Sequence, residues 1–84
     1  MSFHTTITET PAITLVARDL SKSWGRIYLM TRGADILLMS DNEQAFAATL
    51  QGYSVSRVYA NGDCVYKPGQ IYIPEAIGGR YYAV

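Results

Sequence analysis

The stretch RIYLMTRGADILLM, residues 26–39, decides the fold that this sequence predicts. One strand is expected over 26–31 and a return strand over 36–39, with the turn-prone segment RGAD, 32–35, between them. Because successive side chains of a strand point to opposite faces, each strand sends apolar side chains to both faces of this hairpin. A strand that is apolar on both faces normally has both faces covered, and we expect the same here.

The segment after the hairpin predicts a short helix over 41–51. It starts with SDNE at 40–43, a capping box in which the Ser40 hydroxyl accepts from the backbone N–H of Glu43 and the Glu43 side chain returns to Ser40. Gly52 suits the C-terminal end of this helix. Three side chains share one apolar face at spacing i, i+4 and i+7, namely Phe46, Leu50 and Tyr53.

The residues upstream of the hairpin fit a second helix, over 11–23. One face of a helical wheel combines Ile13, Val16, Ala17, Leu20 and Trp24. Thr10 suits the N-cap, Pro11 the first helical position and Gly25 the C-terminal exit. The run ITLV at 13–16 is also typical of a strand. A helix is the favoured interpretation, and a strand is the alternative.

The rest of the chain predicts strands and turns. Strands are expected over 55–60, 63–66, 71–73 and 80–84. Asn61-Gly62 is the strongest short hairpin signal, a type I′ turn that needs positive φ at both residues. The segment KPGQ at 67–70 fits a type II turn. With Asn61-Gly62 as the loop, the facing pairs are Tyr59 with Cys64 and Val58 with Val65.

Together these elements predict one small α+β domain over residues 1–84. We expect two layers, in which an antiparallel sheet of about five to six strands carries one or two short helices, about 11–23 and 41–51, on one face. Near the N-terminus, Ile7 between two threonines fits either a short edge strand or a loose segment.

The amino-acid composition argues against several classes of protein, namely disordered, nucleic-acid-binding and membrane-attached ones. Hydrophobic residues make up 49% of the chain and charged residues 17%, which argues against disorder. Seven Lys and Arg balance seven Asp and Glu without a cluster of either sign, so we expect no nucleic-acid binding tighter than micromolar and no membrane attachment. Cys64 is the only cysteine, which excludes an intrachain disulfide and indicates a reducing, cytoplasmic environment.

Few residues suggest chemistry, and each has a structural explanation. His4, the only histidine, lies in a weakly patterned terminal segment, whereas a catalytic base needs rigid positioning. Nothing adjacent in sequence activates the Cys64 thiol. Asp41 and Glu43 suit the start of a helix, and GGR at 78–80 suits a plain turn rather than a phosphate loop. We therefore predict no enzymatic activity, no cofactor and no metal site.

Tyrosine is the compositional feature that points to a surface. The seven tyrosines are Tyr28, Tyr53, Tyr59, Tyr66, Tyr72, Tyr81 and Tyr82. Tyrosine is enriched at recognition surfaces because it offers a large contact area with little loss of entropy. It equally suits half-exposed strands. The sequence leaves both interpretations open, interface and scaffold.

The hairpin itself suggests where a partner would bind. One or two short helices cover only one face of a sheet in a two-layer domain, so the second face is expected to meet another molecule. The centre of that surface would be Tyr28, Met30, Leu37 and Met39, or the alternate set Ile27, Leu29, Ile36 and Leu38. Its rim would be Tyr59, Tyr66, Tyr72, Tyr81 and Tyr82. We expect self-association or a tight complex with a larger protein.

In size and layout, the chain resembles small phage- and plasmid-encoded proteins, a broad class that includes anti-CRISPR proteins and other inhibitors of host machinery. The shared layout is a hairpin, a short capped helix and further strands, and no individual residue role follows from it. The leading hypothesis is a non-enzymatic binding protein that docks on a larger protein or complex, as such inhibitors do. The alternatives are a homo-oligomeric structural or accessory subunit and, least favoured, a nucleic-acid-binding module whose tyrosines stack on bases.

Overall fold

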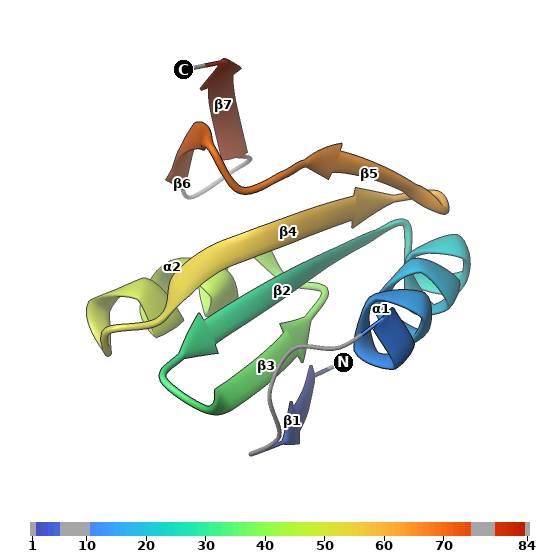
Figure 1. Ribbon diagram of the computed structural model, residues 1–84, viewed down its shortest axis with the longest axis horizontal. Coiled ribbons are helices and arrows are strands. Elements are labelled where there is room, and N and C mark those ends of the chain that lie inside the picture. Colours follow the sequence, from blue (N-terminus) through green and yellow to red (C-terminus); the bar gives the residue numbers. More distant parts are fainter. Residues whose placement is uncertain (1, 6–10, 75–78, 84) are drawn as a thin grey trace.

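The protein is an α+β domain in which a central antiparallel sheet carries two helices. The computed structural model describes residues 2–5, 11–74 and 79–83. The elements are β1 (Ser2–Thr5), α1 (Pro11–Trp24), β2 (Arg26–Arg32), β3 (Asp35–Met39), α2 (Asn42–Leu50), β4 (Ser54–Ala60), β5 (Asp63–Tyr66), β6 (Gln70–Pro74) and β7 (Gly79–Ala83). Five strands form one sheet in the order β1-β3-β2-β4-β5, and β6 and β7 pair separately (Figure 1). The predicted α+β class, with an antiparallel sheet and two short helices, is confirmed.

The β2–β3 hairpin is covered on both faces by the same chain. The face that we call the α1 face presents Ile27, Leu29, Ile36, Leu38 and Tyr59 to Ile13 and Ala17 of α1. The face that we call the α2 face presents Tyr28, Met30, Met39, Val58 and Tyr66 to Ala45 and Ala48 of α2. The helices therefore lie on opposite sides of the sheet (Figure 1). This corrects the expected placement of both helices on one face: side chains alternate along β2, and each short helix covers one of the two apolar faces.

Helix α1 confirms the helical interpretation over the strand alternative. Pro11 is its first residue, where a missing N–H leaves no hydrogen bond unmade. The helix ends at Trp24, and the Gly25 N–H donates to the Ser21 carbonyl at 2.8 Å. Ile13 and Ala17 are buried as the wheel predicted, whereas Val16 and Trp24 from the same predicted face are exposed. Thr10, the predicted N-cap, lies outside the described residues.

Helix α2 begins one residue later than the predicted cap implies. Asp41 is the N-cap, and its Oδ1 accepts from the Glu43 N–H at 2.7 Å and from the Gln44 N–H at 3.4 Å. This corrects the assignment of Ser40 as the cap. A carboxylate at this position satisfies two N–H groups that lack helical partners and also interacts favourably with the positive end of the helix.

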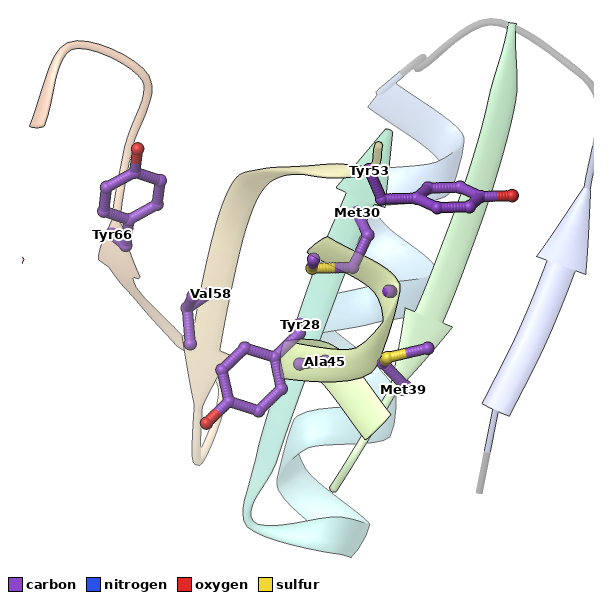
Figure 2. Packing of buried hydrophobic residues seen from close by; sticks show 8 residues of the cluster. Tyr28, Met30, Met39, Ala45, Tyr53, Val58 and Tyr66 are labelled. Carbon is purple, nitrogen blue, oxygen red and sulfur yellow. The ribbon is translucent and has the colours of Figure 1, made fainter. Parts of the chain in front are cut away.

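The side of α2 that faces the sheet is also corrected. The helix packs through Ala45 and Ala48, while Phe46 and Leu50 of the predicted apolar face are exposed. Tyr53 is buried, but it follows the helix instead of belonging to it. Figure 2 shows the reason: tyrosine and methionine side chains of the α2 face fill the space beside Ala45, so only a small side chain fits there.

The turns largely follow the sequence. Asn61 and Gly62 have φ of 52° and 91°, which confirms the positive φ that a type I′ turn requires. Tyr59 pairs with Cys64 as predicted, but Val58 pairs with Tyr66 instead of Val65. The register shifts between Val58 and Tyr59, because one extra residue in the ladder forms a β-bulge there.

The β6–β7 hairpin is separate from the main sheet. The turn that leads into it is closed by the Gln70 N–H, which donates to the Lys67 carbonyl at 3.3 Å. Tyr72 of β6 packs against the α2 face, beside Tyr28 and Tyr66. The α2 face is thus covered by a helix together with a strand. At the other end of the chain, β1 forms the sheet edge beside β3, and Ile7 lies outside the described residues.

Candidate functional site

The predicted centre of a partner-binding surface lies in the core. Tyr28, Met30 and Met39 are buried on the α2 face, and Leu37 is half-buried beside them. The alternate set is buried on the α1 face and consists of Ile27, Leu29, Ile36 and Leu38. The predicted interface depends on one open face of the hairpin, and the structure shows both faces covered by the same chain. Apart from the half-buried Leu37, these side chains are buried in the core of this chain and present almost no surface to a partner.

The predicted rim tyrosines are divided between the two faces. Tyr59 is buried on the α1 face, and Tyr66 is buried on the α2 face. Tyr72 is half-buried, with its ring centroid 5.3 Å from that of Tyr66 and 6.2 Å from that of Tyr28. Tyr81 and Tyr82 belong to β7, and their side chains lie outside the described residues. For Tyr59, Tyr66 and Tyr72 the structure favours the scaffold interpretation.

The residues considered as candidates for catalysis or metal binding make contacts that stabilise the fold, where the structure describes them. The half-buried Cys64 thiol donates to the Tyr66 carbonyl at 3.0 Å, and Asp41 caps α2. His4 contributes its backbone to β1, and its side chain and Gly78 lie outside the described residues. Within the described parts of the chain, no three His, Cys, Asp or Glu side chains come together where they could hold a metal ion.

A pocket of about 630 Å³ lies between α1 and the β4–β5 edge of the sheet, and we call it the α1 pocket. Three cationic side chains line it: Arg18 of α1, Arg57 of β4 and Lys67 in the turn after β5. The remaining lining is Pro11, Thr14, Tyr59, Cys64 and Pro68. Of the Asp and Glu side chains in the described residues, none lines this pocket. The α1 pocket is therefore electropositive and suited to an anionic group.

Local structure explains how these side chains meet. Arg57 and Tyr59 are two residues apart on β4, so they point to the same face of the sheet. Cys64 faces Tyr59 across the β4–β5 pair. Helix α1 packs over β2 and β4, which brings Arg18 to the pocket, with its guanidinium carbon 5.8 Å from the Tyr59 ring centroid. Lys67 follows directly after β5, at the start of the turn into β6.

The Tyr59 phenol of the α1 pocket has a raised pKa. Burial raises the pKa of the Tyr59 phenol above its usual value, and the neighbouring Cys64 raises it further. The charges of Arg57 and Arg18 and a hydrogen bond with Thr14 lower the same pKa, but by less. A phenol is protonated at neutral pH in any case, and the raised pKa of Tyr59 moves its ionisation further from neutrality. The phenol offers the pocket a neutral polar group and adds no negative charge to oppose an anionic ligand.

A second candidate lies on the opposite side of the molecule. Phe46 and Leu50 of α2, four residues apart, are 41% and 75% exposed. Ile71 and Ile73 of β6, which contacts α2, are also exposed because they alternate with the inward-facing Tyr72. We call Phe46, Leu50, Ile71 and Ile73 together the α2 surface. Glu43 is the only charged residue of α2, so few charges would lose water if a partner covered this helix.

Sequence reasoning missed both candidates for different reasons. The cations of the α1 pocket lie at 18, 57 and 67, so no local motif connects them. The spacing of Phe46 and Leu50 predicts an apolar stripe on the inner side of the helix, whereas the structure places this stripe on the outer side. The available signal was Ala45 and Ala48 at spacing i, i+3, because small residues on one side of a helix allow close packing against bulky neighbours.

Within residues 11–74, which include both described helices, neither helix is long and apolar enough to cross a membrane. Comparisons of this chain with protein-family models, with curated protein sequences and with solved structures found no match.

Proposed function

We propose that this protein is a non-enzymatic binding protein that docks on a larger protein through the α2 surface. The observation that carries this proposal is the exposure of Phe46 and Leu50 on a helix that packs inward through alanines alone. Two large apolar side chains one helical turn apart form the kind of ridge that recognition helices place in an apolar groove.

The energetics support docking. Complete burial of a Phe or Leu side chain stabilises a structure by about 1.5–3 kcal/mol. In the free chain, Leu50 at 75% exposure leaves most of this gain unused, and Phe46 at 41% exposure leaves a smaller part of it unused. Ile71 and Ile73 add further exposed apolar side chains on β6, the strand that contacts α2. Aromatic and aliphatic anchors of this kind, buried at the centre of an interface, supply most of the binding energy in protein complexes.

The finer features of the proposal rest on composition and layout. A cytoplasmic location agrees with the single cysteine, Cys64. Inhibition of host machinery is the form of binding that agrees with the resemblance to small phage- and plasmid-encoded proteins. A homo-oligomeric subunit is the alternative, and the same surface favours it, because an apolar ridge with few charges also fits a second copy of itself.

The experiment compares two double variants with the wild-type protein. Phe46→Ser with Leu50→Ser removes the ridge, while Leu15→Ser with Val16→Ser removes two exposed apolar side chains from α1 as a matched control. Each tagged protein is crosslinked in the source cells, and captured proteins are quantified by mass spectrometry. Sedimentation velocity of the purified proteins measures self-association, and circular dichroism verifies the fold.

We expect the wild type and the α1 control to capture the same partner, and the α2 variant to lose at least about tenfold of it, corresponding to about 1.4 kcal/mol. Equal capture by all three proteins would contradict docking through the α2 surface. If the wild type sediments as an oligomer and the α2 variant as a monomer, with no other partner captured, the homo-oligomeric alternative replaces the proposal.

A further inference from the structure

We propose that the α1 pocket binds a phosphate monoester group, a site distinct from the α2 surface and independent of docking there. Three cations converge on this pocket, Arg18, Arg57 and Lys67, and none of the acidic side chains in the described residues lines it. The pocket thus concentrates positive charge in a chain whose formal net charge is zero.

The arrangement of the cations favours phosphate over carboxylate. Arg18, Arg57 and Lys67 come from a helix, a strand and a turn, so they reach the pocket from three separate elements. A carboxylate is planar, and one guanidinium satisfies both of its oxygens through two parallel hydrogen bonds. A phosphate monoester has three terminal oxygens in a tetrahedral arrangement and up to two negative charges, which suits donors that approach from several sides.

The size of the pocket leaves room for whatever carries the phosphate. Its volume of about 630 Å³ lies within the range of about 300–1,000 Å³ that is typical of small-molecule sites. Pro11 and Pro68 supply rigid apolar walls, and the protonated Tyr59 phenol adds a neutral polar group. The carrier is either a free small molecule or a phosphorylated side chain of another protein, because both present the same monoester chemistry.

The test is an NMR titration of the full, ¹⁵N-labelled chain at low salt. The probes are inorganic phosphate, phenyl phosphate and a short peptide that contains phosphoserine, with benzoate as the carboxylate of matched size. We expect saturable shifts of the amides of residues that line the pocket, and weaker binding as salt screens the charges. Tighter binding of phenyl phosphate than of the peptide identifies a small-molecule site, and the reverse order identifies a phosphorylated side chain.

Charge variants locate the binding. Arg18→Gln and Lys67→Gln should each weaken phenyl phosphate binding by about tenfold, since each removes one charged hydrogen-bond donor. Lys22→Gln removes the same charge from the same helix outside the pocket, and we expect a change below about twofold. Arg18, Lys67 and Lys22 are all exposed, so these variants should keep the fold. The Phe46→Ser, Leu50→Ser protein should bind phenyl phosphate as the wild type does.

The pH dependence follows from the ligand. A phosphate monoester gains its second charge at about pH 6, so its affinity should rise several-fold between about pH 5 and pH 7.5, while that of benzoate should not. The proposal is overturned if no saturable shifts appear, if Lys22→Gln weakens binding as much as Arg18→Gln does, or if benzoate binds as tightly as phenyl phosphate. Loss of docking in the α2 variant would not alter any of these results.

Discussion

The α1 face and the α2 face of the sheet are covered by helices that differ in length and composition. The α1 face is mostly aliphatic, and the 14-residue α1 covers it with Ile13 and Ala17. The α2 face is rich in tyrosine and methionine, and the nine-residue α2 contributes only Ala45 and Ala48 to it, with help from Tyr72 of β6. On the α2 side, the sheet supplies the bulk of the core and the helix supplies very little.

This difference has a consequence for the outer surfaces. When the side of a helix that packs on the sheet consists of alanines, its large side chains lie on the solvent side. In α2 these are Phe46 and Leu50, which are exposed. In helix α1, Ile13 is buried in the core, and Arg18 lines the pocket at the flank of the helix. The two sides of one small domain therefore offer different chemistry, an apolar ridge on one and a cationic pocket on the other.

The C-terminal ends of the helices are held by different interactions as well. Ser21 of α1 is fully buried, and its Oγ donates to the Arg18 carbonyl and accepts from the Gly62 N–H. After α2, Arg32 donates to the Gln51 carbonyl at 2.9 Å and lies over the Tyr53 ring at 4.4 Å. The first contact is enclosed, whereas the second is exposed to solvent, so the first should contribute more to stability.

The largest expected effect tests whether both faces are true core. Leu29 and Met30 are neighbours on β2 that point to opposite faces, and both are 0% exposed. Leu29→Ala and Met30→Ala should each lower the free energy of unfolding by about 2–5 kcal/mol, because each leaves a cavity. Urea denaturation measures both. A loss below about 1 kcal/mol for Met30→Ala alone would show that α2 and β6 cover their face only loosely.

The next effect concerns the buried hydroxyl that fixes α1 to the β4–β5 turn. Ser21→Ala leaves the Gly62 N–H without its acceptor, which is 2.8 Å away, and should destabilise the fold by about 1–3 kcal/mol. Ser23→Ala, at an exposed position of the same helix, should change stability by less than about 0.5 kcal/mol. Thermal melts that overlay for the two variants would place the attachment of α1 elsewhere.

The smallest effect distinguishes two assignments of the α2 cap. Asp41→Ala should destabilise the protein by about 0.5–2 kcal/mol, because the N–H groups of Glu43 and Gln44 lose their acceptor. Asp41→Asn retains a capping oxygen and should lose less. Urea melts of Ser40→Ala provide the comparison, and a larger loss there than for Asp41→Ala would restore the capping box predicted from sequence.

Much of the fold could be predicted because it depends on local chemistry. Apolar runs around a turn-prone segment specify the β2–β3 hairpin. Asn61-Gly62 specifies the β4–β5 hairpin, because few other residue pairs can adopt positive φ at two consecutive positions. Pro11 and Gly25 mark the limits of α1 in the same way. These signals act within a few residues, so the amino-acid sequence by itself determined the order and type of the elements from α1 to β7. It did not specify β1 (Ser2–Thr5), whose segment carries no clear pattern.

The tertiary structure decided what each element faces. Periodicity shows which side chains share a side of α2, but the volume of Tyr28 and Met30 decides that Ala45 turns inward and Phe46 outward. The separation of the β6–β7 hairpin from the main sheet is likewise decided by tertiary structure and follows from no local pattern. The α1 pocket combines residues from a helix, a strand and a turn that are far apart in the chain. Such contacts depend on matching shapes between distant segments, which no local pattern encodes.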